Sequence, residues 1–400
     1  MRWLFFILIL AGSAFMAFSS SWALVLTGGG ARGAYEAGSL RAINQLDLDV
    51  KGVYGTSVGA LNGIFYCQGE TEKLYKIWQD LSYSDVMSVN ASSTTNMYFH
   101  VAREILSFHL LNVEPLREIV KENIDEKRIR DSGIDFGLVT YDLSKFSPVE
   151  LYLSQIPKGQ LLDYVLASAN YPIFQRQVIN GQTYIDGGVY NNAPVNMAIE
   201  KGFKKILLIN VSDIPFSLPQ IPKDVELKII TPSGTIGSAM DFNPTDERRL
   251  EKMGYLDTLK AFGKFVGRDY YIYPPKSPVL INALLSMNAT ELSKVAGILD
   301  LNIGGYSHDL AVYEVLIPKI LQTVKATSFD SLNLDLLEMA ASTLDVNRLT
   351  PYTQRELVMA IAKSDQKLRT SFLFFQISDN SIVESVREIC KFIVSSGMKC

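Results

Sequence analysis

The chain has 400 residues, of which 48% are hydrophobic and 20% charged, a composition typical of a folded protein with one large domain or two ordinary ones. Its formal net charge is −4 and it has no long basic run, so we expect no nucleic-acid partner. The three cysteines, Cys67, Cys390 and Cys400, are too few and too widely spaced for a disulfide scaffold or a metal site, although Cys390 and Cys400 would be able to pair in an oxidising compartment.

Residues 1–23 have the pattern of a targeting segment. One cation, Arg2, precedes an uninterrupted run of apolar or small residues from Trp3 to Phe18, and small and polar residues follow as far as Ala23. This pattern predicts a secretory signal peptide that is cleaved after Ala23, and hence a secreted or periplasmic protein. A retained membrane anchor is the alternative, although the run is shorter than the ~20 residues that a bilayer span needs.

Apolar periodicity predicts alternating strands and helices from residue 24 to about residue 230, and a nearly all-helical region after about residue 280. Short loops between the first strands and helices favour a parallel βαβ arrangement in an α/β fold. The prolines within 273–278 predict a boundary between a domain at 24–275 and a helical region at 276–400. The expected strands are Leu24–Thr27, Val50–Gly55, Phe136–Tyr141, Val149–Leu153, Lys205–Val211 and Glu226–Ile230, with a hairpin turn at Asn180-Gly181; the main expected helices are Ala34–Leu46, Val58–Tyr66, Thr71–Leu81 and Gln160–Ala169.

The second expected strand ends in YGTSVGA, residues 54–60, where the next helix begins. The string from Gly55 to Gly59 matches G-x-S-x-G at a strand-to-helix turn, which is the context of a nucleophile elbow. Ser57 is therefore a candidate nucleophile, and Gly55 and Gly59 keep the sharp turn free of clashes. The helix that starts at Val58 offers free N–H groups that stabilise negative charge. A tight turn without catalysis is the simpler alternative.

The first expected strand runs into LTGGGARGAY, residues 26–35. Successive glycines at 28–30 allow several backbone N–H groups to converge on one point, which suits either an oxyanion hole or a phosphate site. Phosphate binding is disfavoured because no Walker lysine follows, and because Gly55 stands where a dinucleotide site has an acidic residue. Arg32 either orients this loop, attracts an anionic head group, or is an ordinary surface arginine.

A nucleophilic serine needs a base, and the chain has only three histidines: His100, His109 and His308. The other candidate is Asp186, which ends an expected strand in the stretch YIDGGVYNNAPV. Burial among apolar neighbours would raise the pKa of this carboxyl toward the range that suits a general base. An ordinary Asp-Gly turn is the alternative.

Three motifs together resemble the patatin-like phospholipase family: GGGARG at 28–33, GTSVG at 55–59 and DGG at 186–188. Similar phrases, such as VLASANYPIF at 165–174, extend the resemblance over roughly residues 24–265. It implies a three-layer α/β/α fold and a Ser57–Asp186 dyad without histidine. It also implies hydrolysis of lipid esters at a membrane or micelle surface, with no cofactor. The implied oxyanion hole comprises Gly28, Gly29, Gly30, Arg32 and Val58, and the glycines that support the motifs are Gly33, Gly55, Gly59, Gly187 and Gly188.

Three other functions remain open. An α/β-hydrolase would use Ser57, Asp186 and His308 in that chain order, but several strands precede the nucleophile in that fold and only two do so here. A lipid- or nucleotide-binding protein would need no turnover, and an acyltransferase would use the same dyad.

Residues 96–113 are either a core helix or a mobile, lipid-facing cover over the site.

Overall fold

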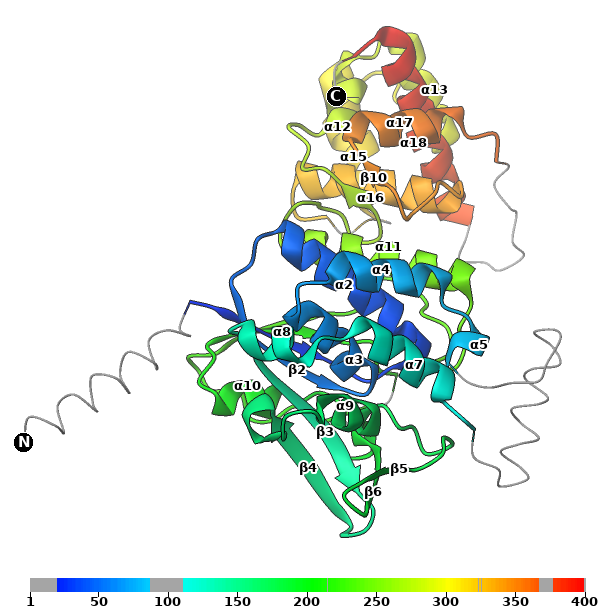
Figure 1. The fold of residues 1–400 in the computed structure, drawn as a ribbon. Coiled ribbons are helices and arrows are strands. Elements are labelled where there is room, and N and C mark those ends of the chain that lie inside the picture. The colour runs from blue at the N-terminus through cyan, green and yellow to red at the C-terminus, as the bar shows by residue number, and fades with distance from the viewer. Residues whose placement is uncertain are drawn as a thin grey trace, which may run out of the picture. The chain divides into compact units, whose positions relative to one another are not determined.

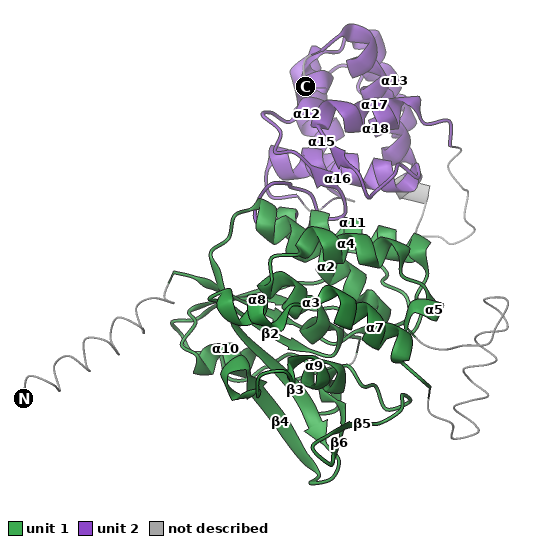
Figure 2. Cartoon of the chain, in the orientation of Figure 1, with its two compact units in different colours: residues 1–259 green, residues 260–400 purple. Residues whose placement is uncertain are grey.

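The structure is a computed structural model that describes residues 20–86, 111–213, 215–322, 324, 326–366 and 377–398. The chain divides into two compact units, residues 1–259 and 260–400 (Figure 2). The division falls before the expected boundary at 275/276, because Tyr270 and Ile272 belong to the hydrophobic core of the second unit. Residues 1–19 of the expected signal peptide, and residues 96–110 of the expected cover, lie outside the described residues.

An eight-stranded sheet forms the centre of the first unit, with the order β5-β6-β3-β2-β1-β7-β8 and β4 paired with β3 (Figure 1). β1, β2, β3, β7 and β8 are parallel, whereas β4 and β6 run antiparallel to β3, and β5 antiparallel to β6. The carboxyl ends of the parallel strands therefore meet at one edge. The strands are β1 (Trp22–Leu26), β2 (Val50–Thr56), β3 (Asp135–Asp142), β4 (Ser147–Tyr152), β5 (Gln177–Ile179), β6 (Gln182–Asp186), β7 (Lys205–Ile209) and β8 (Glu226–Ile230).

Helices cover both faces of this sheet. Because side chains alternate along a strand, β1 presents Leu26 to α3 on one face and Val25 to α10 on the other. α2 and α4 pack with α3 on the first face, and α10 contacts β1 and β2 on the other. The unit therefore has the three-layer α/β/α architecture that the family resemblance implies (Figure 1). The helices are α2 (Gly33–Gln45), α3 (Val58–Cys67), α4 (Thr71–Asp80), α5 (Tyr83–Val86), α7 (Glu114–Asn123), α8 (Glu126–Asp131), α9 (Leu161–Ser168), α10 (Val195–Glu200) and α11 (Pro244–Ala261).

Strand β1 begins before the expected cleavage point. Trp22 and Ala23 are buried and pair in register with β7, and the backbone N–H of Trp22 donates to the carbonyl of Asp49 (2.7 Å). The Ser21 hydroxyl also donates to the Asp49 carboxylate (2.6 Å). Cleavage after Ala23 would remove the first two residues of a central strand.

The hairpin between β5 and β6 turns at Asn180-Gly181, as the sequence predicts. Both residues have positive φ, 50° and 78°, which is the backbone of the type I′ turn that Asn-Gly favours. This hairpin positions β6, and Asp186 is the last residue of β6. The Asn-Gly turn thus fixes the start of the strand that ends at Asp186, the candidate base.

The second unit is helical, as expected, with one addition. Two short strands, β9 (Tyr271–Ile272) and β10 (Pro351–Tyr352), pair in parallel. No helix within the described ranges is both long and apolar enough to span a membrane. The helices of this unit are α12 (Val279–Ser286), α13 (Ala289–Ile298), α14 (His308–Leu310), a π-helical turn at Ala311–Leu316, α15 (Ile317–Leu321), α16 (Phe329–Thr343), α17 (Gln354–Lys363) and α18 (Ile377–Ser396).

Candidate active site

Ser57 stands between the end of β2 and the start of α3, at the carboxyl edge of the sheet. Its backbone is strained, with φ 57° and ψ −125°, a region that non-glycine residues rarely occupy. Its N–H donates to the hydroxyl of Ser168 (3.0 Å), which in turn donates to the carbonyl of Val139 (2.6 Å). The strained turn is thus held from α9 and β3.

The glycines around this turn are required by close backbone contacts. A Cβ at Gly55 would collide with the backbone of Gly59, and a Cβ at Gly59 would collide with the carbonyl of Leu26. A Cβ at Gly33 would collide with the Val58 side chain, and a Cβ at Gly187 with the carbonyl of Val139. The close approach of β1, β2 and the start of α3 therefore depends on small residues at these positions.

Asp186 ends β6 and lies directly beside Ser57. The Ser57 hydroxyl donates to Asp186 Oδ2 (2.6 Å), and the Gly188 N–H donates to Asp186 Oδ1 (2.7 Å). The carboxyl group is almost completely buried. Burial raises the pKa of Asp186 to about 6, although the hydrogen bonds from Ser57 and Gly188 act in the opposite direction. A carboxylate with this pKa is a better proton acceptor than an ordinary aspartate and is still largely ionised at neutral pH.

The glycine loop follows β1 and reaches the same edge of the sheet. The sequence-based prediction includes Gly28 in the oxyanion hole. In the structure, the N–H of Gly28 already donates to Asn192 Oδ1 (3.0 Å). Gly30 has φ +58° and starts a short 3₁₀ turn that ends at Arg32. Because the Gly28 N–H is engaged, the remaining candidate donors are the N–H groups of Gly29, Gly30 and Val58, three residues that line one cavity with Ser57.

Arg32 has a different position from the one expected of an oxyanion-hole residue or a surface arginine. Its side chain is buried, and its guanidinium forms an ion pair with Asp213 through both terminal nitrogens (2.6 Å each). Its Nε donates to the carbonyl of Gly237 (3.0 Å), and Nη1 approaches the carbonyl of Val211 (3.5 Å). Arg32 therefore ties the glycine loop to the segments after β7 and before α11, which is the loop-orienting role among the sequence alternatives.

A cavity of about 660 Å³ opens above Ser57 and Asp186. Its polar end contains the glycine loop, Ser57, Asp186 and Asn192, whereas most of its wall is aliphatic and aromatic. This size and lining suit an apolar ligand with one polar group at the reacting end. The apolar wall includes Leu61, Phe65, Leu74, Trp78, Leu116 and Phe174.

In the alternative triad, His308 would stand between Ser57 and Asp186 as the base. His308 belongs to the second unit, where its Nε2 lies 2.8 Å from the carbonyl of Met287 and its Nδ1 lies 3.3 Å from Asp309. The direct hydrogen bond between Ser57 and Asp186 leaves no imidazole between them. His100 and His109 lie outside the described residues. Within the described ranges, no group of three or more His, Cys, Asp or Glu side chains is arranged to hold a metal ion.

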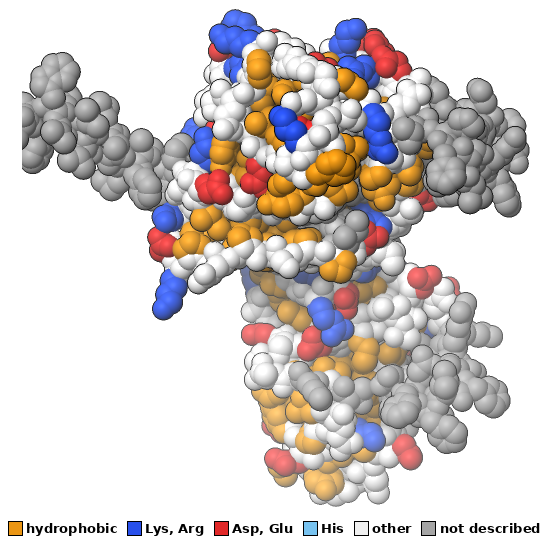
Figure 3. All heavy atoms as spheres, turned by 90° about the horizontal axis from the view of Figure 1, so that it is seen from below, with side chains coloured by type: hydrophobic (Ala, Val, Ile, Leu, Met, Phe, Trp, Pro, Cys, Tyr) orange, Lys and Arg blue, Asp and Glu red, His pale blue; other side chains and the backbone are white. Residues whose placement is uncertain are grey.

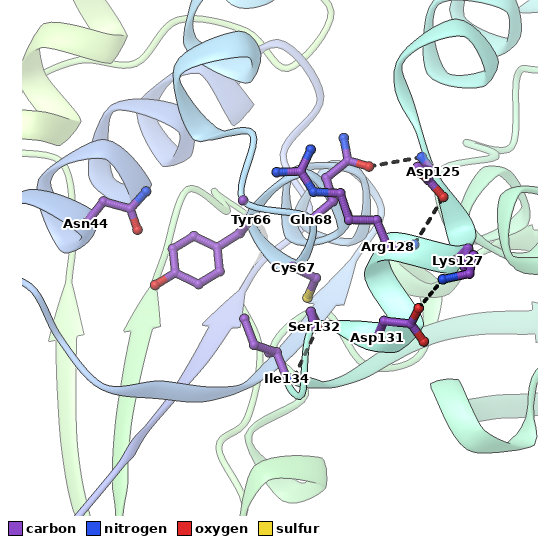
Figure 4. Close-up of a pocket in the computed structure, with 11 residues that line it drawn as sticks. Asn44, Tyr66, Cys67, Gln68, Asp125, Lys127, Arg128, Asp131, Ser132 and Ile134 are labelled. Carbon is purple, nitrogen blue, oxygen red and sulfur yellow. Dashed lines mark hydrogen bonds and ion pairs between the residues drawn. The ribbon is translucent and has the colours of Figure 1, made fainter.

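A second hollow, of about 580 Å³, lies where α3 ends beside α8 (Figure 4). Its charged side chains have partners: Lys127 pairs with Asp131 (2.6 Å), and Arg128 pairs with Glu70 (2.6 Å). Cys67 is buried beneath it, and burial raises the pKa of its thiol well above the ordinary value. A thiol that stays protonated is a weak nucleophile, so this hollow does not compete with the Ser57 cavity as a reaction site.

Two polar residues of the site are absent from the sequence-based prediction. Ser168 receives the Ser57 N–H, and Asn192 binds the glycine loop through both ends of its amide. The sequence signals for these two residues are a serine at the end of an apolar helix and an asparagine just after the DGG turn. Neither signal identifies its partner, because the paired residues are 111 and 164 positions apart along the chain.

The fold and the site together define an α/β domain that places a serine and a buried aspartate in contact at the carboxyl edge of its sheet, below an apolar cavity. Residues 24–199 match the family model of the patatin-like phospholipases. A patatin-like phospholipase domain-containing protein of Caenorhabditis elegans, ZK370.4, is 28% identical over 196 residues, which are 48% of this chain and 14% of that protein. The part of the chain that matches this family, residues 24–199, contains both Ser57 and Asp186.

Two further proteins are similar to this chain. A probable lipid hydrolase, 463L, of Invertebrate iridescent virus 6 is 26% identical over 189 residues, which are 46% of this chain and 64% of that protein. The chain thus spans less than two thirds of the length of these curated relatives. The crystal structure of VipD from Legionella pneumophila is similar with a TM-score of 0.40 and 13% identity, over 95% of this chain and 93% of that one.

Proposed function

We propose that this protein is a lipid acyl hydrolase of the phospholipase A or lysophospholipase type, which cleaves carboxylic ester bonds through Ser57 and Asp186. The observation that carries the proposal is the 2.6 Å hydrogen bond from the Ser57 hydroxyl to a buried carboxylate, at the polar end of an apolar cavity. The family of the domain and the name of the viral relative agree with this activity.

In the proposed reaction, the ester carbonyl lies next to Ser57 and the acyl chain occupies the apolar part of the cavity. Ser57 Oγ attacks the carbonyl carbon while its proton passes to Asp186. The N–H groups of Gly29, Gly30 and Val58, three residues that line the same cavity, are the proposed donors to the oxyanion that forms. Collapse of this intermediate breaks the ester bond, and the leaving alcohol takes the proton from Asp186.

The acyl-enzyme is then cleaved by water. Asp186 accepts a proton from the attacking water molecule, and a second tetrahedral intermediate forms at the same carbon. Its collapse releases the fatty acid and returns the proton to Ser57 Oγ, which restores the starting state. One carboxylate thus serves both half-reactions, as a base in the attack and as an acid in the departure.

A lipid surface is the proposed source of the substrate. Hydrophobic side chains gather in patches between charged ones on the near face of the molecule (Figure 3). Next to the catalytic turn, Val189 and Tyr190 are more than half exposed, and Tyr171 at the cavity wall is nearly half exposed. Exposed apolar side chains around a cavity mouth favour contact with lipid.

Product analysis tests this function. Purified protein is incubated with mixed phospholipids and neutral lipids, and Ser57→Ala is the matched control. We expect free fatty acid from the wild type and none above background from Ser57→Ala. Transfer of the acyl chain to an added alcohol or lysolipid, without free acid, would assign an acyltransferase instead. Binding of lipid without any product would assign a lipid-binding protein.

A further inference from the structure

Asn192 connects the two loops that form the candidate site. It is buried just before α10, in the segment that follows the Asp186 turn. Its Oδ1 accepts the N–H of Gly28 (3.0 Å), and its Nδ2 donates to the carbonyl of Gly28 (3.3 Å) and to the hydroxyl of Ser212 (2.9 Å). One side chain therefore binds both polar groups of a single glycine in the loop after β1.

The same amide is close to both proposed catalytic residues. A Cβ at Gly28 would lie 2.5 Å from Asn192 Oδ1 and 3.0 Å from Ser57 Cβ. A Cβ at Gly188 would lie 3.0 Å from Asn192 Oδ1 and 3.1 Å from Asp186 Oδ1. Asn192 Oδ1 thus lies between the glycine loop and the turn that holds the carboxylate.

We infer that Asn192 is a positioning residue for the oxyanion hole. The inference rests on the proposed function. Asn192 fixes the orientation of the Gly28 peptide groups, and this orientation sets where the following N–H groups of Gly29 and Gly30 are directed. Because Asn192 belongs to the segment after Asp186, the distance between the oxyanion donors and the base is set by one short stretch of chain.

Asparagine suits this position because its amide both accepts and donates. Aspartate keeps an acceptor for the Gly28 N–H but has no donor for the Gly28 carbonyl, and it brings a negative charge toward the oxyanion. Alanine reaches neither group. Loss of preorganisation affects the transition state more than substrate binding, so the expected effect falls on kcat rather than on KM.

The test measures kcat, KM and the pH dependence of kcat/KM on a soluble short-chain ester, with the full chain. We expect Asn192→Asp to lower kcat on the order of 10²-fold with little change in KM. The acidic limb of the kcat/KM profile of Asn192→Asp should move to higher pH, because a second carboxylate near Asp186 favours the protonated form of Asp186. Asn192→Ala should also lower kcat but leave the acid limb in place.

The neighbouring Asn191 provides the matched control. Its side chain donates to Glu150 (2.7 Å) and Asn196 (2.8 Å) and does not line the cavity. Asn191→Ala should lower the thermal unfolding midpoint without changing kcat or the pH profile. Equal effects on kcat at both positions would reduce Asn192 to a structural role and overturn the inference.

Two further outcomes separate this inference from the proposed function. If Ser57→Ala is inactive and Asn192→Asp has wild-type kcat with an unshifted acid limb, only the role of Asn192 is wrong. If Ser57→Ala retains activity, the proposed function itself is wrong. Circular dichroism and thermal unfolding check each variant, and Asn192→Ala provides the kcat criterion if Asn192→Asp does not fold.

Discussion

At the scale of single residues, the candidate site combines a serine in a strained backbone conformation, the proposed nucleophile, with a buried aspartate, the proposed base, whose pKa is raised by burial. The φ of 57° at Ser57 costs on the order of 1–3 kcal/mol, and the hydrogen bond from its N–H to Ser168 helps to hold that conformation. The sequence predicts Ser57 and Asp186, because each belongs to a local motif with a defined turn. It does not predict Ser168 or Asn192, because their roles arise only from contacts with distant parts of the chain.

The pKa of Asp186 leads to a prediction about pH. Burial raises this pKa to about 6. In the proposed mechanism, only the ionised carboxylate accepts the proton of Ser57. Activity should therefore rise with pH through about 6 and decline below it, measured as kcat/KM on a neutral ester. An acid limb near pH 4, the ordinary value for aspartate, would show that the carboxyl is not desolvated in the free protein.

At the scale of secondary-structure elements, α11 contains two buried acids, Glu247 and Glu251. Burial, followed by the like charge of Glu251, raises the pKa of Glu247 to about 9, and burial raises the pKa of Glu251 to about 8. An acid whose pKa is raised by folding stabilises the folded state at low pH. That stabilisation is lost as the pH rises from the unfolded value of about 4.3 toward the folded value.

We therefore predict that Glu247→Gln makes the protein more stable than the wild type at pH 8, by on the order of 1–2 kcal/mol, with a smaller difference at pH 5. Thermal unfolding at the two pH values measures this effect. Glu226→Gln, in the exposed first position of β8, is the control and should show no such pH dependence. A Glu247→Gln variant with the same loss of stability at both pH values would indicate that the carboxyl is held by specific contacts instead.

The position of strand β1 also limits where the N-terminal segment can be cleaved. Because Trp22 and Ala23 pair within the sheet, we propose that any removal of the N-terminal segment stops before Trp22. N-terminal sequencing of protein from the native host measures this. A mature chain that begins at Leu24 and folds would contradict the proposal, and a chain that still begins at Met1 in the membrane fraction would indicate a retained anchor.

At the scale of the whole molecule, the alternation of strands and helices was enough to predict the α/β sheet and the edge where the motifs meet. The proline cluster did not predict the position of the division between the two units. That position depends on the hydrophobic core in which Tyr270 and Ile272 are buried, and this is the core of the second unit. The pairing of β9 with β10 was also not predictable, because each strand has only two residues and the partners are far apart in sequence. Local patterns specify elements, whereas packing between distant elements decides where one unit ends.

The most direct test of the Ser57–Asp186 mechanism compares Asp186→Asn and His308→Ala with Ser57→Ala, all folded, by kcat/KM on a soluble ester. The proposed mechanism predicts that Ser57→Ala is inactive, that Asp186→Asn loses on the order of 10²- to 10⁴-fold, and that His308→Ala retains most of the activity. Wild-type activity in Asp186→Asn, or a loss in His308→Ala as large as that in Ser57→Ala, would contradict the assignment of Asp186 as the base.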